Sequence, residues 1–146
     1  MINYKFDCPN TIKISDKRKV IYTISKKHRG RNPQKSYWII KKPDEISLFI
    51  DSLKSGYEDE NKYCAWNLWI IDGNAVVLGC SLAKEELKIA KFINSAKDDH
   101  WHGYPANYIK KSQDIPSAKI LTLWHIKGLI NTATMKKIRG GQPCNL

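Results

Sequence analysis

The segment KKPDEISLFIDSLKSG, residues 41–56, decides the architecture of this chain. Within it, Pro43 is suited to the first position of a helix. Two carboxylates, Asp44 and Glu45, follow in the first turn, where the helix dipole favours negative charge. Gly56 supplies the left-handed residue that ends a helix. The apolar residues recur three and four positions apart, as on one face of an α-helix: Ile46, Phe49, Ile50 and Leu53. We therefore predict an amphipathic helix that begins at Pro43.

The residues before this helix alternate between apolar and polar side chains, as half-buried strands do. Two such runs, residues 11–15 and 20–24, are joined by the polar residues 16–19 and predict a hairpin. Residues 36–42 predict a third strand. Between the second and third strands, residues 26–35 are interrupted by glycine, asparagine and proline, and half of them are basic, which predicts an exposed loop.

The middle of the chain predicts a second hairpin and a second helix. Residues 63–71 are apolar on both faces, which is typical of a central strand covered on each side. The Asp-Gly pair at 72–73 is a hairpin signal, and residues 74–80 supply the return strand. Ser81 then caps a predicted helix over residues 82–96, whose apolar spacing fits one inward face.

The last part of the chain predicts two further helices, over residues 116–127 and 132–139, with Asn131 or Thr132 as the cap of the second. A helix-turn-helix reading of this pair is possible, but the second helix is short for reading a DNA groove, so we favour a packed helical hairpin. We find no internal repeat and no linker. The sequence therefore predicts one α+β domain over residues 1–146: a mainly antiparallel sheet of about five strands, two amphipathic helices and a C-terminal helical hairpin.

Positive charge is the main compositional feature of the chain. It has 25 Lys and Arg against 14 Asp and Glu, a formal net charge of +11. Residues 1–43 hold twelve basic residues against two acids, residues 101–146 hold seven against one, and residues 44–100 are acidic. This asymmetry predicts a polyanionic or acidic partner on one side of the molecule, although a solvated basic face gives the same pattern.

Several classes of protein are not expected. No run approaches the roughly 18 apolar residues of a membrane span, and the first residues lack the apolar core of a signal peptide. No phosphate-binding glycine loop or G-x-S-x-G elbow occurs, so we expect no cofactor and neither nucleotide nor serine hydrolysis.

Cysteine usage favours a reducing, cytoplasmic setting. The four cysteines, Cys8, Cys64, Cys80 and Cys144, form no C-x-x-C pair. If a two-residue turn at 72–73 joins the second hairpin, Cys64 and Cys80 point to opposite faces and do not bridge. We therefore expect reduced thiols.

The loop of residues 26–35 is the best binding candidate. An arginine guanidinium can clamp a phosphate with two hydrogen bonds, a lysine adds a point charge, and Gly30 lets the backbone approach closely. Tyr37 and Trp38 adjoin the loop, and since a strand places only one of the two outward, one of them can offer a stacking surface to unpaired bases while the other belongs to the core. The candidate contacts are Lys26, Lys27, Arg29, Arg31 and Lys35, extended by Lys136, Lys137 and Arg139 if the last helix packs nearby.

The densest unusual stretch is DDHWHGYP, residues 98–105. Histidine titrates near neutral pH, so His100 or His102 can act as a general acid or base. One of the two aspartates at 98–99 can orient an imidazole, and Tyr104 can donate a hydrogen bond to a phosphate or a developing oxyanion. We therefore regard these residues as catalytic candidates.

Two other interpretations of this stretch remain open. In the first, Trp101 and Tyr104 pin a structural turn from which the histidines face solvent. In the second, both histidines bind a metal ion together with Asp98, His125 or a cysteine, but the chain shows no established metal-ligand spacing. We therefore predict no metal site.

Three functions compete for these residues. The first is RNA or DNA binding through the basic loop, which predicts binding that weakens steeply with salt. The second is a protein-binding module of immunity or inhibitor type that covers an acidic partner. The third is a small metal-independent ribonuclease with His102 or His100 as its base and Arg29 or Arg31 steadying the phosphate. We rank nucleic-acid binding first and the enzyme third.

Overall fold

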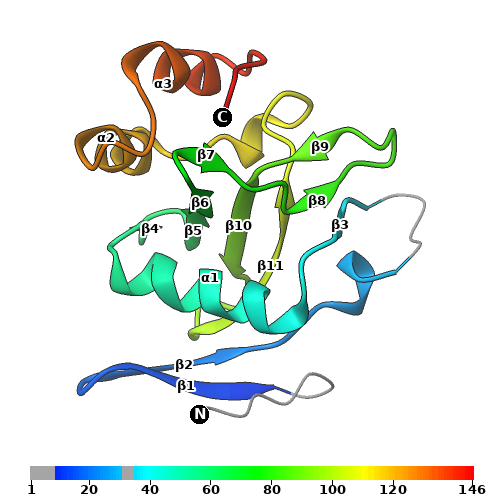
Figure 1. The fold of residues 1–146 in the computed structure, drawn as a ribbon. Helices are drawn as coiled ribbons and strands as arrows, with labels where there is room; N and C mark the ends of the chain where they lie inside the picture. Colours follow the sequence, from blue (N-terminus) through cyan, green and yellow to red (C-terminus); the bar gives the residue numbers. More distant parts are fainter. Residues whose placement is uncertain (1–8, 31–34) are drawn as a thin grey trace.

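The structure, a computed structural model, describes residues 9–30 and 35–146. In chain order its elements are β1 (Asn10–Ser15), β2 (Arg18–Tyr22), η1 (Lys26–His28), β3 (Tyr37–Trp38), α1 (Lys42–Lys54), β4 (Glu58–Asp59), β5 (Cys64–Asn67), β6 (Ile70–Ile71), β7 (Asn74–Ala75), β8 (Gly79–Cys80), β9 (Glu86–Leu87), β10 (Ile89–Asn94), β11 (His100–Ala106), η2 (Ser112–Asp114), α2 (Ala118–Ile126) and α3 (Thr132–Arg139) (Figure 1). The fold is of the α+β class, as the sequence predicts. None of the helices in the described ranges is long and apolar enough to cross a membrane.

The main sheet is mixed. Among the described residues it has six strands in the order β1-β2-β11-β10-β5-β4. Neighbouring strands are antiparallel except β2 and β11, which run parallel with Ile21 opposite His100 and Tyr22 opposite Trp101. Two parallel neighbours need a long crossover connection, and the chain from the end of β2 to the start of β11, which includes α1, provides it. The predicted α+β class is therefore confirmed. The sheet differs from the predicted one of about five mainly antiparallel strands, because it has six strands and one neighbouring pair is parallel.

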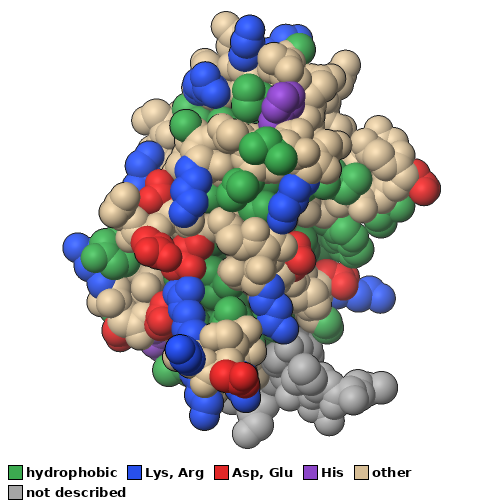
Figure 2. Space-filling view, turned by 90° about the vertical axis from the view of Figure 1, so that its left-hand side faces the viewer, with side chains coloured by type: hydrophobic (Ala, Val, Ile, Leu, Met, Phe, Trp, Pro, Cys, Tyr) green, Lys and Arg blue, Asp and Glu red, His purple; other side chains and the backbone are tan. Residues whose placement is uncertain are grey.

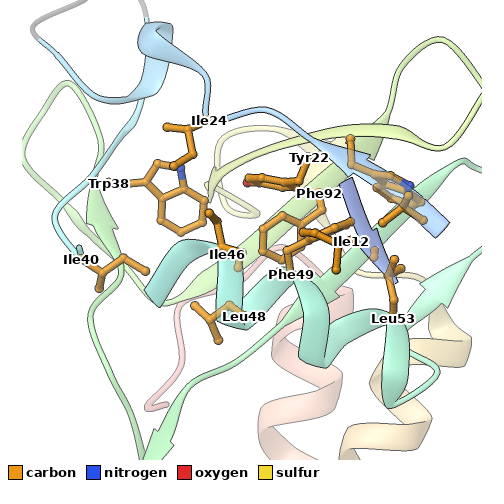
Figure 3. Packing of buried hydrophobic residues seen from close by; sticks show 14 of the residues in the cluster. Ile12, Tyr22, Ile24, Trp38, Ile40, Ile46, Leu48, Phe49, Leu53 and Phe92 are labelled. Atoms are coloured by element: carbon orange, nitrogen blue, oxygen red, sulfur yellow. The ribbon is translucent and has the colours of Figure 1, made fainter. Parts of the chain in front are cut away.

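The two faces of the main sheet carry different layers (Figure 1). α1 covers one face, where the Phe49 ring lies 4.5, 5.4 and 5.5 Å from the rings of Tyr22, Phe92 and Trp101 (Figure 3). α2 and α3 cover part of the opposite face, where Trp66 of β5 is buried. Beside β2 and β11, neither α2 nor α3 covers that opposite face, and the candidate site lies there, with η1 and η2 contributing to its lining.

The predicted helices at residues 43–56 and at the C-terminus are confirmed. Pro43 lies in the first turn of α1, and Gly56, with φ of 79°, takes the left-handed conformation just after it. Asn131 is the cap of α3, because its side-chain oxygen accepts a hydrogen bond from the backbone N–H of Thr134 at 2.8 Å. α2 and α3 contact each other and form the expected helical hairpin.

The helix predicted over residues 82–96 is wrong. Residues 81–84 form a tight turn, in which the Ser81 hydroxyl accepts a hydrogen bond from the backbone N–H of Glu85 at 3.0 Å instead of capping a helix. β9 and β10 follow, and β10 pairs with both β11 and β5 at the centre of the sheet. Both faces of a central strand are buried, so its apolar residues need not alternate, and here their spacing imitated a helical face.

The strand predicted over residues 63–71 is interrupted. β5 ends at Asn67, whose side-chain amide donates to the backbone carbonyl of Leu48 and to the carboxylate of Asp51 at 3.0 and 2.9 Å. The turn at 72–73 forms, but it joins only the two-residue strands β6 and β7. β8 pairs instead with β3 and β9 in a separate sheet.

Two smaller expectations change as a result. Cys64 and Cys80 lie in different sheets, so the argument from a shared hairpin does not apply to them. Both are free thiols, as is Cys144, whereas Cys8 lies outside the described residues. The third strand, predicted over residues 36–42, is reduced to the two residues of β3, because α1 already begins at the end of that range.

Candidate functional site

The stretch HWHGYPA, residues 100–106, is a strand and not a turn. As β11 it pairs with β10 over most of its length. Side chains alternate across a strand, so Trp101 is buried on the face that α1 covers, while His100, His102 and Tyr104 share the opposite face and are half-buried. The strand thus presents all three catalytic candidates on one surface.

These three side chains line an open pocket of about 770 Å³. The walls come from segments distant in the sequence: Pro9, the residues after β2, η1, residues 35–36, the end of β10 and the residues after it, β11, and the residues that follow β11. Its basic and imidazole side chains are Lys27, His28, Lys35, His100, His102 and Lys111. No aspartate or glutamate of the described residues lines it. The pocket is therefore positive and large enough for a small ligand, since such sites occupy roughly 300–1,000 Å³.

Hydrogen bonding fixes the tautomer of His28. Its Nδ1 lies 2.7 Å from the backbone carbonyl oxygen of Ser36, and a carbonyl can only accept, so Nδ1 carries the proton. The ring stacks on that of Tyr104 with centroids 5.0 Å apart. Burial lowers the pKa of His28, against the opposing effect of the Ser36 carbonyl. His28 is therefore neutral at pH 7, with an unprotonated Nε2.

His102 and His100 stand side by side on β11 and differ in their surroundings. The His102 ring has no hydrogen-bond partner within the part of the chain that the structure describes. Burial lowers its pKa, and electrostatic interactions with nearby His100 and Lys27 act in the same direction. The His100 Nε2 lies 2.9 Å from the hydroxyl oxygen of Thr23, which holds the ring in place.

The two aspartates predicted to orient an imidazole do not do so. Asp98 accepts a hydrogen bond from the backbone N–H of His100 at 3.1 Å and does not contact its ring. Asp99 accepts from the Arg18 guanidinium at 2.7 Å and from the indole N–H of Trp101 at 3.2 Å. Arg18 therefore lowers the pKa of the Asp99 carboxyl, which serves the sheet and not the pocket.

The Tyr104 hydroxyl, predicted as a donor to substrate, has a partner within the protein. It donates to the buried carboxylate of Asp114 at 2.6 Å. The same carboxylate accepts from the backbone N–H of Asn107 at 2.9 Å and pairs with the buried ammonium of Lys91 at 3.4 Å. Burial and the Asp114 hydrogen bond raise the pKa of Tyr104. Tyr104 thus forms a wall of the pocket and supports the His28 ring.

Arg29 points into the protein instead of forming an exposed phosphate clamp. Its guanidinium donates to one carboxylate oxygen of Glu45, at 2.7 and 3.1 Å, and to the backbone carbonyl of Ile40. Glu45 is fully buried, and its other oxygen accepts from the Tyr22 hydroxyl at 2.5 Å. Arg29 thereby anchors η1 to α1, and η1 in turn places Lys27 and His28 at the pocket.

Of the remaining basic residues predicted to contact a phosphate, some line the pocket and others do not. Lys27 and Lys35 line the pocket, and Lys26 is exposed on η1 without lining it. Arg31 lies outside the described residues. The three basic residues of α3 are exposed at the end of the molecule away from η1, so α3 does not extend the positive surface of the pocket (Figure 1). These three are Lys136, Lys137 and Arg139.

Other parts of the surface do not share the purely positive charge of this pocket. On the left-hand side of Figure 1, Lys and Arg side chains are interspersed with Asp and Glu (Figure 2). A second pocket, of about 490 Å³ between α1 and the end of β5, is lined by Asp44 and Asp51 and by no basic residue of the described chain. The pocket on β11 is therefore the better match to a phosphate.

Sequence reasoning missed two residues of the site. His28 lies within the predicted basic loop, but nothing in the sequence shows that its side chain turns inward to stack on Tyr104. Lys111 follows β11 and reaches the pocket only because the chain folds back over the end of that strand. The described residues contain no group of three or more His, Cys, Asp and Glu suited to a metal ion.

No protein-family model, curated protein or solved structure matches this chain.

Proposed function

We propose that this protein binds nucleic acid, RNA or DNA, through unpaired nucleotides that enter the pocket on β11. The observation that carries the proposal is the convergence of Lys27, Lys35 and Lys111, from three separate segments, on one concave surface that no described carboxylate lines. Three ammonium groups around one cavity attract a phosphate and release its counterions on binding.

The shape of the site favours a single strand. The phosphates of a duplex lie on its convex outer surface, whereas an unpaired nucleotide can insert its phosphate and sugar into a cavity. The ring N–H groups of His100 and His102 add hydrogen-bond donors beside the lysines. Lys26, exposed on the same short helix as Lys27, extends the positive surface beyond the rim.

Two triple variants test the proposal. Lys27→Ala/Lys35→Ala/Lys111→Ala removes three positive charges at the pocket, and Lys136→Ala/Lys137→Ala/Arg139→Ala removes three exposed charges on α3. Fluorescence anisotropy with labelled single-stranded RNA, single-stranded DNA and duplex DNA, over a salt series, gives the affinity and its salt dependence for each protein.

The pocket variant should bind single strands at least about tenfold more weakly, and the slope of log affinity against log salt should fall by about two, because roughly 0.7 is lost per phosphate contact. The α3 variant should bind like the wild type. Equal losses in the two variants would show that net charge alone drives binding. No binding near 150 mM salt would reject the proposal and favour an acidic protein partner.

A further inference from the structure

We infer that the same pocket cleaves RNA by transesterification, with His102 as general base and His100 as general acid. The inference rests on the proposed nucleic-acid binding and adds the substrate class and the reaction. In the step, the 2′-hydroxyl oxygen attacks the adjacent phosphorus. The O2′–P bond forms and the P–O5′ bond breaks. His102 takes the proton of the 2′-hydroxyl, and His100 gives a proton to the leaving O5′.

The spacing of the two imidazoles fits this reaction. His100 and His102 are two residues apart on one face of β11, so their backbone positions are separated by about 6.7 Å. An in-line displacement needs a proton acceptor at the attacking oxygen and a proton donor at the leaving oxygen, on opposite sides of one phosphorus. Two side chains that project in parallel from a strand can flank a phosphate in this way.

The surroundings of each ring suit its role. A general base must have a free nitrogen lone pair at working pH, and His102 is neutral with no described group occupying its ring. His100 is held by the Thr23 hydroxyl at 2.9 Å, which orients the imidazole that must deliver a proton. His28, stacked on Tyr104 and hydrogen-bonded to the Ser36 carbonyl, lines the pocket beside them.

The lysines supply the electrostatic part of the reaction. Negative charge builds on the phosphoryl oxygens as the new P–O bond forms, and fixed positive groups lower the energy of that state most where water is partly excluded. Lys27, Lys35 and Lys111 surround the cavity, and these lysines replace the arginines that the sequence suggests for this task. The products are a 2′,3′-cyclic phosphate and a 5′-hydroxyl. DNA has no 2′-hydroxyl and cannot react.

Cleavage assays with a labelled single-stranded RNA in excess EDTA test the inference. The proteins are the wild type, His100→Gln, His102→Gln and the control His125→Gln, which removes the fourth histidine, on α2, away from the pocket. We expect the wild type to release fragments that mass spectrometry identifies as 2′,3′-cyclic phosphates. His100→Gln and His102→Gln should each lower the rate about 10²- to 10⁴-fold, the usual contribution of a general acid or base.

A second readout leaves the protein unchanged. The same strand with every ribose replaced by 2′-deoxyribose should bind with similar affinity in anisotropy and resist cleavage. This arm decides the question even if a histidine variant fails to fold, which thermal melting would reveal.

Each other outcome has a defined meaning. RNA that binds but stays intact overturns the cleavage reaction and leaves nucleic-acid binding standing. RNA that neither binds nor is cleaved overturns both proposals. Cleavage that persists in His102→Gln, or that gives no cyclic phosphate, overturns the assigned chemistry.

Discussion

Arg29 and Glu45 show how a single buried pair positions the pocket. The Glu45 carboxylate is fully buried and the Arg29 guanidinium only 15% exposed, so their charges interact out of water. A buried pair offsets the loss of hydration only when its hydrogen bonds are complete, and here Tyr22 and the Ile40 carbonyl complete them. Burial raises the pKa of Glu45, and the hydrogen bonds from Tyr22 and Arg29 oppose that rise.

Arg29→Ala should therefore destabilise the protein strongly. Removing one partner leaves the Glu45 carboxylate buried without its counter-charge, which typically costs about 3–5 kcal/mol. Urea denaturation followed by tryptophan fluorescence measures the change in the free energy of unfolding. Lys26→Ala, at an exposed neighbour on η1, should change that free energy by less than about 0.5 kcal/mol. Losses of similar size in the two variants would contradict the anchoring role.

At the scale of elements, β11 positions the site, because one of its faces packs against the core and the other lines the pocket. Trp101 and Gly103 face the core under α1, and the alternate residues face the pocket. Gly103 lies so close to β10 that an added Cβ would stand 2.4 Å from Cδ1 of Phe92 and 2.8 Å from the Tyr22 hydroxyl oxygen. A side chain at this position would push β11 away from the aromatic core.

Gly103→Ala should destabilise the protein by about 1–3 kcal/mol through overpacking. The neighbours are aromatic rings inside the sheet, so they cannot yield as a flexible side chain would. Gly30→Ala is the matched control, because no described atom lies within 4 Å of an added Cβ there. Thermal melting of both variants checks the prediction, and a Gly103→Ala protein as stable as the wild type would refute it.

The elements that sequence reasoning predicted are those with strong local signals. Pro43 and Gly56 mark the boundaries of α1, and Asn131 marks the start of α3. β10 was missed because tertiary pairing on both edges, and not local spacing, makes it a strand. The residues of the site behave likewise: His100 and His102 stand out in the sequence, but which groups face them depends on the parallel pairing of β2 with β11.

At the scale of the whole molecule, His28 and His102 make stability depend on pH. Burial lowers the pKa of both below the usual value near 6.5, so the unfolded chain takes up protons more readily as the pH falls through that value. The free energy of unfolding should be at its full value above about pH 7 and should decrease between about pH 7 and 5. Urea denaturation across this range measures the decrease.

The variants assign this dependence to the two histidines. The slope between pH 7 and 5 should be smaller in His28→Gln/His102→Gln and unchanged in His125→Gln. Asp59 and Asp99, whose pKa values are lowered by hydrogen bonds, contribute only at lower pH and are present in every variant. Equal slopes in all three proteins would mean that other groups carry the dependence.

The parallel pair of β2 and β11 also determines when the pocket can exist during synthesis. Its wall needs residues from Pro9 to Gln113, and Ile21 finds its partner only after His100 has been made. At about 5–20 residues per second, a ribosome needs several seconds to extend the chain from His28 to Gln113. During that time Lys27 and His28 are already present, but the pocket cannot yet form. Fragments from early termination are likewise without it. The pocket therefore exists only in chains that have been made at least as far as Gln113.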